Sequence, residues 1–155
     1  MGMKPAPITQ AILWGGLSAG VLDITAACVN SGLRGRSPVW VLQSVAGGLL
    51  GRNTFQGGLK TAALGLALHF FIATAAAAMY CAASVKLPLL AQRAIVCGLL
   101  YGIAVYLFMY LVVLPLSALH FKFFSQPVMA IFTGVLIHMF CVGLPIALVV
   151  RWYTK

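Results

Sequence analysis

The sequence has few charged residues and almost no acidic ones. Charged side chains make up 7% of its 155 residues, and Asp23 is the single acid against ten lysines and arginines. Soluble domains typically carry about 25% charged residues. The charged fraction is therefore too small to cover a surface that faces water. A single acid also excludes chemistry by a pair of carboxylates within the chain, and any metal cage built from several Asp and Glu side chains.

Cysteine pairs and signature motifs of enzymes are also missing. The four cysteines include no C-x-x-C pair, so the sequence gives no disulfide framework. It contains no glycine-rich phosphate loop, no H-E-x-x-H and no G-x-S-x-G. Because no nucleophile, base and orienting group assemble from its motifs, we expect that the protein is not an enzyme.

Long apolar stretches dominate the sequence instead. Hydrophobic residues make up 63% of the chain, and four stretches reach the length of about 20 residues that a helix needs to cross a bilayer. They are residues 8–30, 59–84, 88–114 and 127–150. Pro88 and Pro127 suit the first turn of a helix, whereas Pro115 and Pro145 are expected to end or kink their helices. The sequence predicts an all-α integral membrane protein with a single membrane domain over residues 1–155.

A fifth apolar piece, residues 38–50, is too short to cross a bilayer. Ser37 and Pro38 resemble an N-cap followed by a first-turn proline, which predicts a short helix. Two placements fit such a helix. It either lies on the membrane surface as an interfacial amphipathic helix, or forms a re-entrant piece that lines a cavity and is buried by protein.

Parts of the second and fourth spans repeat one pattern. Both contain G-x-x-x-H-[FM]-F, with His69 in one copy and His138 in the other. The first and third spans share G-x-x-x-G, at Gly16 and Gly20 and at Gly98 and Gly102. The patterns favour a tandem repeat of a two-span hairpin, with copies related by an axis along the membrane normal. The alternative is chance similarity, because small residues at this spacing are common where membrane helices pack.

The ten bases divide evenly between the two membrane faces. Four spans place both termini on one side, together with Lys4, Lys86, Arg93, Arg151 and Lys155. The other side carries Arg34, Arg36, Arg52, Lys60 and Lys122. The positive-inside rule therefore gives no orientation. We expect Arg34, Arg36, Arg52 and Lys60 to contact anionic lipid headgroups or another anion, and bases spread over both faces do not indicate a nucleic-acid partner.

Three ionisable residues, Asp23, His69 and His138, fall inside predicted spans. Such residues are costly in a bilayer and are candidates for function by default. Counted from the side that bears Arg34, all three lie about 10 to 16 Å deep at the helical rise. Each shares a helix face with small residues, which predicts that it points into the bundle rather than toward lipid.

Several roles fit this candidate pocket. His69 and His138 are candidate ligands of a metal ion or of the axial positions of a haem. Asp23 and the histidines also suit a proton relay, because imidazole titrates near neutral pH. The structural alternative is that each histidine only donates to a backbone carbonyl one turn away, and that Asp23 only accepts from Thr25, Asn30 or a loop arginine.

The sequence thus favours a binding or transport protein with an intramembrane Asp/His pocket for a small ligand, metal, haem or proton. The alternative is a non-catalytic structural or assembly subunit that packs against another membrane protein or a second copy of itself. Its length and span count resemble those of small bacterial inner-membrane proteins. We therefore expect a multi-pass protein of a bacterial-type inner (cytoplasmic) membrane.

Overall fold

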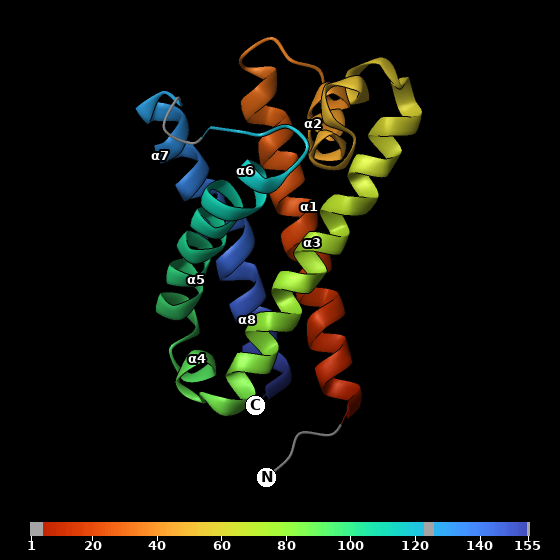
Figure 1. Ribbon diagram of the computed structural model, residues 1–155. Coiled ribbons are helices and arrows are strands. Elements are labelled where there is room, and N and C mark those ends of the chain that lie inside the picture. Colours follow the sequence, from red (N-terminus) through yellow and green to blue (C-terminus); the bar gives the residue numbers. More distant parts are fainter. Residues whose placement is uncertain (1–4, 123–125, 155) are drawn as a thin grey trace.

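The computed structural model describes residues 5–122 and 126–154, and every regular element in these two segments is a helix (Figure 1). Four helices are long and apolar enough to cross a membrane. They are Ile8–Gly32, Gly58–Lys86, Ala94–Leu116 and Val128–Thr154. The prediction of an all-α membrane protein with four spans and one short additional helix is confirmed.

The first two spans are continuous helices, whereas the last two contain a π-helical segment. In chain order the elements are α1 (Pro5–Gly32), α2 (Pro38–Leu50), η1 (Gly51–Gln56), α3 (Gly58–Lys86), α4 (Leu89–Gln92), α5 (Ala94–Phe108), η2 (Met109–Val113), α6 (Leu114–Leu116), α7 (Val128–Ile137), η4 (His138–Gly143) and α8 (Leu144–Thr154). The π-helical segments are η2 and η4. π-Helical turns within α-helices are often found at functional sites.

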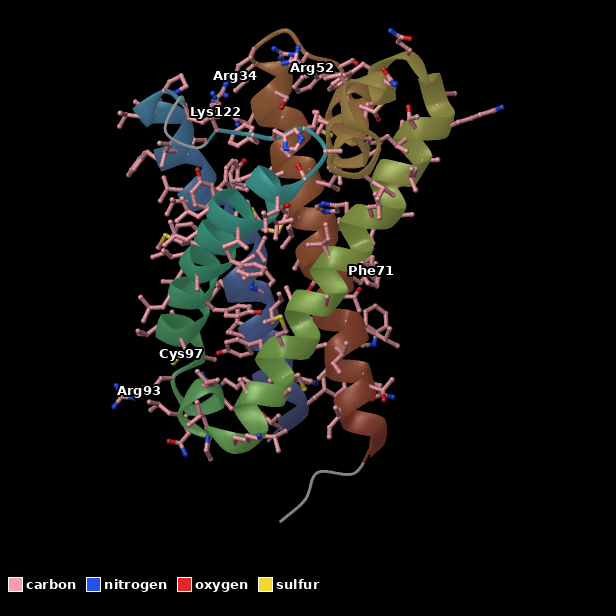
Figure 2. The ribbon with its side chains drawn as sticks, in the orientation of Figure 1. Arg34, Arg52, Phe71, Arg93, Cys97 and Lys122 are labelled. Atoms are coloured by element: carbon pink, nitrogen blue, oxygen red, sulfur yellow. The ribbon has the colours of Figure 1, made fainter. Side chains whose placement is uncertain are left out.

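The two ends of the bundle differ in their elements. α1 begins and α8 ends at the same end, close to α4, whereas α2 and α6 lie at the opposite end (Figure 1). Arg34, Arg52 and Lys122 lie at that opposite end, and Arg93 lies at the end of α4 (Figure 2). We call the end that carries Arg34, Arg52 and Lys122 the basic end.

The start of the third span needs correction. Pro88 precedes only the single turn α4, and the backbone leaves helical geometry at Arg93, so the third span begins at Ala94 rather than at Pro88. Of the two outcomes predicted at Pro145, an end or a kink, the helix does not end, because α8 continues to Thr154. The π-helical η4 directly before it supplies a widened turn, which accommodates a ring that lacks an N–H and would crowd the preceding turn. Pro115 is followed by the end of its helix at Leu116, as predicted.

The short helix α2 has the predicted bounds and the predicted cap. Ser37 accepts a hydrogen bond from the Trp40 N–H at 3.2 Å, and Pro38 occupies the first turn. α2 stays at the basic end and packs closely on α3. A Cβ added to Gly65 would lie 2.7 Å from the carbonyl carbon of Leu42, so only glycine permits this approach.

Close glycine contacts occur within each pair of spans. In the first pair, Gly20 of α1 lies against Phe70, the residue after His69. In the second pair, Gly102 of α5 lies against the main chain of His138 and Met139. The tandem repeat itself stays a prediction.

The first glycine of each G-x-x-x-G pattern also makes a close contact. Gly16 lies against Thr74, and Gly98 lies against Gly143. Both partners come five positions after the histidine of their own span. Small residues thus let the backbones of each hairpin approach closely.

Large apolar side chains cover the outside of the bundle. Phe71 is 71% exposed and projects outward from α3 (Figure 2), and Leu100 and Phe140 are also exposed. Side chains of this kind suit helices that face lipid. The interior instead contains many small residues, among them Ala11, Ala77 and Cys81.

Candidate functional site

A cavity of about 640 Å³ lies between the helices in the half of the bundle near the basic end. Its wall comprises residues from all four spans, from α2 and from the connection after α6. Asp23, His69 and His138 all line it, so the structure brings the three predicted site residues to one cavity. Its volume falls within the range of about 300–1,000 Å³ that is usual for small-molecule sites.

One face of α1 supplies a long strip of the cavity wall. Ala19, Asp23, Ala27, Asn30 and Arg34 all line the cavity. Residues spaced by three or four positions share one face of a helix, so the first four side chains follow one another along α1, and Arg34 continues the strip from the turn after the helix. The strip therefore changes from apolar to anionic to cationic along its length.

Asp23 has no bonded partner in the part of the chain that the structure describes. The Thr25 hydroxyl, one of the predicted donors, instead donates to the carbonyl of Val21 at 2.6 Å. The Asp23 carboxylate makes no hydrogen bond or ion pair within residues 5–122 and 126–154. The carboxylate is half-buried in the cavity wall, so the structural role expected from Thr25, Asn30 or a loop arginine is not realised among these residues.

His69 joins α3 to α1. Its Nε2 lies 2.9 Å from the carbonyl oxygen of Gly20. Because a carbonyl oxygen can only accept, Nε2 must carry the proton and Nδ1 retains its lone pair. The acceptor lies on another helix rather than one turn away, so only the His138 bond described next has the structural geometry considered for the histidines. The ring of His69 also lines the cavity.

His138 is held differently, by its own helix. Its Nδ1 lies 3.0 Å from the carbonyl oxygen of Gly134, so Nδ1 donates and the Nε2 lone pair stays available. The ring of Tyr106 meets the ring of His138 edge-on, with centroids 5.2 Å apart. The helical register and this aromatic contact fix the direction of the imidazole.

Tyr110 is a site residue that sequence analysis missed. It lines the cavity, stacks on Tyr106 with centroids 4.3 Å apart, and lies close enough to Asp23 and Arg34 to interact electrostatically with both. Tyr110 belongs to the π-helical η2, and His138 begins the π-helical η4. A tyrosine in an aromatic-rich span gives no sequence signal of its own, because such residues usually only pack.

A buried polar network also went unpredicted, and it holds α2 in the cavity wall. The Gln43 amide donates to the Gly58 carbonyl at 3.0 Å and lies 3.3 Å from the Thr61 hydroxyl. The Thr54 hydroxyl donates to the Gln43 carbonyl at 3.0 Å, and the Thr61 hydroxyl donates to the Thr54 carbonyl at 2.7 Å. Gln43 and Thr54 are buried, so their bonds are expected to be expensive to break.

The four predicted anion contacts have different environments. Arg34 is part of the cavity wall, although its side chain is exposed. The guanidinium of Arg36 lies over the ring of Trp40, 3.9 Å from the centroid. Arg52 and Lys60 are exposed outside the cavity wall. Only Arg34 therefore combines an anion-binding group with the cavity.

The donors present do not assemble into a metal cluster. Within the described segments, no three His, Cys, Asp or Glu side chains lie close enough together to hold a metal ion. His69 and His138 each offer one lone pair, and their N–H groups donate to carbonyls as those of ligating histidines usually do. Two lone pairs without a third ligand do not make a typical protein zinc site.

Comparison of the chain with protein-family models, with characterised proteins and with solved structures finds no match. The cavity itself therefore supplies the argument for function.

Proposed function

We propose that this protein is a non-catalytic membrane protein that binds a small ligand inside the bundle, for transport or for sensing, in the cavity of Asp23, His69 and His138. The observation that carries the proposal is the convergence of these residues, from three different spans, on one cavity of about 640 Å³. The setting we propose is a bacterial-type inner membrane, in keeping with the small size and four spans.

Among the described residues the Asp23 carboxylate has no bonded partner, which supports a ligand or a proton in that role. A carboxylate at the centre of a membrane helix costs about 2.5–3.5 kcal/mol on insertion scales. A bundle that retained Asp23 only for packing would be expected to satisfy it with a neighbouring donor, but none of the described residues provides one. A bound cation or proton would recover part of that cost.

Native mass spectrometry tests the proposal. Protein extracted gently from its host membrane is compared with the variants Asp23→Asn and His138→Ala, and with the outward-facing control Phe71→Ala. We expect a small-molecule adduct on the wild type and on the control that is lost or weakened in both cavity variants. An absorption spectrum and metal analysis of the same samples identify haem or metal as the adduct.

Adducts that are the same in all four proteins, or absent from all four, would contradict the proposal. A stoichiometric partner protein that binds the wild type and Asp23→Asn equally would instead favour the assembly subunit.

A further inference from the structure

We infer that the cavity takes a single-chain amphiphile whose parts follow one order, an apolar tail, then an ammonium group, then an anionic group. This inference rests on the proposed function and names the ligand class for the same site. The inference follows from the lining residues at three successive levels of the cavity wall.

The level farthest from the basic end is apolar. On each span, the lining residues beyond the site residues are small or aliphatic, as seen for Ala19, Ala73, Ala76, Val105 and Val142. Ala76 follows His69 by seven positions, which is about 10 Å along the helix. This level suits an alkyl chain of roughly octyl length.

The middle level is anionic. Asp23 is the single acid of the chain, and no bond satisfies it within the described residues. Tyr110 lies within its electrostatic range, and the ring of Tyr110 meets that of Phe121 edge-on at 5.6 Å. A cavity wall that carries a carboxylate and aromatic rings suits an ammonium group, which gains from the opposite charge and from the ring faces.

The level nearest the basic end is cationic. Arg34 lies in the turn that follows α1 and also lines the cavity, and Tyr110 is within electrostatic range of both Arg34 and Asp23. Lys122 lies at the same end of the bundle (Figure 2). An anionic group such as a carboxylate or a sulfonate would bind here, whereas a plain cation would meet repulsion before it reached Asp23.

The order of the two charges distinguishes this ligand class from the commoner zwitterionic lipids. In a phosphocholine the anion lies next to the tail and the ammonium group lies at the end. If such a molecule placed its tail in the apolar part of the cavity, its anion would lie at Asp23 and its cation at Arg34. Both of its charges would then be repelled by a like charge. The cavity volume also suits one chain with a small headgroup.

Trp40 provides a direct reporter of binding. It lines the cavity, whereas Trp14 and Trp152, the other two tryptophans, are 54% and 77% exposed. A protein with Trp14→Phe and Trp152→Phe in lipid nanodiscs therefore emits from Trp40 alone. It is titrated with octyl sulfobetaine, with octyl phosphocholine, which has the reverse charge order, and with octyltrimethylammonium, which has no anion.

We expect the sulfobetaine to bind about tenfold or more tightly than either comparison probe, because it alone satisfies both charges. Arg34→Gln should weaken sulfobetaine binding about tenfold and leave the binding of octyltrimethylammonium unchanged or improved. Arg52→Gln removes the same charge at the same end but outside the cavity wall, so it should change neither affinity by more than about twofold. Asp23→Asn should weaken both probes that place an ammonium group next to the tail.

Equal affinity for the three probes would overturn the charge order and leave the ligand cavity in place. An effect of Arg52→Gln on sulfobetaine affinity as large as that of Arg34→Gln would also overturn the charge order and leave the ligand cavity in place. If no probe changes the Trp40 emission while native mass spectrometry finds a cavity-dependent adduct, the ligand class is wrong and the proposed function stands. If no probe changes the Trp40 emission and native mass spectrometry finds no cavity-dependent adduct, both the ligand class and the proposed function are contradicted.

Discussion

The contact between α2 and α3 should be the most sensitive point of the cavity wall to a single added methyl group. In Gly65→Ala, the new Cβ would lie 2.7 Å from the carbonyl carbon of Leu42 and 3.2 Å from the nitrogen of Ala46. Non-bonded carbon atoms prefer about 3.5–4.0 Å, so the two backbones must separate by about 1 Å. Main-chain atoms cannot rotate out of the way as a side chain can.

We expect Gly65→Ala to lower the free energy of unfolding by about 2 kcal/mol, within the range of about 1–3 kcal/mol for overpacked interiors. This loss corresponds to about a thirtyfold change in the unfolding equilibrium constant. Titration of purified protein with sodium dodecyl sulfate in mixed micelles, followed by far-UV circular dichroism, measures it. The lower free energy of unfolding should be accompanied by greater exposure of Trp40 to a water-soluble quencher, because α2 forms part of the cavity wall.

Gly32→Ala is the matched control. Gly32 also lies in a helix, but a Cβ added there would meet nothing within 4 Å. Alanine has the higher helix propensity, so this variant should be neutral or more stable by up to about 1 kcal/mol. If Gly65→Ala unfolds at the same detergent fraction as the wild type and as Gly32→Ala, then α2 does not pack on α3 as described, and this part of the reasoning fails.

Three further substitutions test other contacts in the same titration. Gly102→Ala should destabilise by about 1–3 kcal/mol, because its Cβ would meet the main chain of His138, and unchanged stability would contradict the packing of the second hairpin. Tyr80→Phe removes a 2.9 Å hydrogen bond to the Leu90 carbonyl, for an expected loss of about 1 kcal/mol and faster amide exchange in α4; slow exchange would argue against that bond. Ser37→Ala should cost about 1 kcal/mol at the N-cap of α2, whereas Ser37→Asn should retain the cap, and equal losses in the two would exclude the capping role.

Helix lengths and the ends of α2 were predictable because they depend on local properties of the chain. An apolar run of sufficient length must form a helix in lipid, where every backbone polar group needs an internal partner. Ser37 and Pro38 mark the start of α2 for equally local reasons. The predicted start of the third span at Pro88 was wrong, because that start depends on the turn at Arg93. At Pro145 the helix continues, after the π-helical η4.

The candidate site was predictable in part. Ionisable residues in apolar spans are rare enough to identify Asp23, His69 and His138 from the sequence alone. Tyr110 and Gln43 were not identified, because a tyrosine or glutamine in or beside an apolar helix has many uses. Their roles follow only from the neighbours that other helices bring to them.

The sequence by itself determined the lipid environment, the four spans, the short helix and the three ionisable residues, because each follows from composition or from helical periodicity within one segment. The tertiary structure decided that these residues line one cavity, that both histidines donate to carbonyls, and that Asp23 has no partner within the described segments. It also placed Arg34 in the wall with Asp23 and Tyr110. These features depend on how the helices pack, through close glycine contacts between segments that lie far apart in the chain.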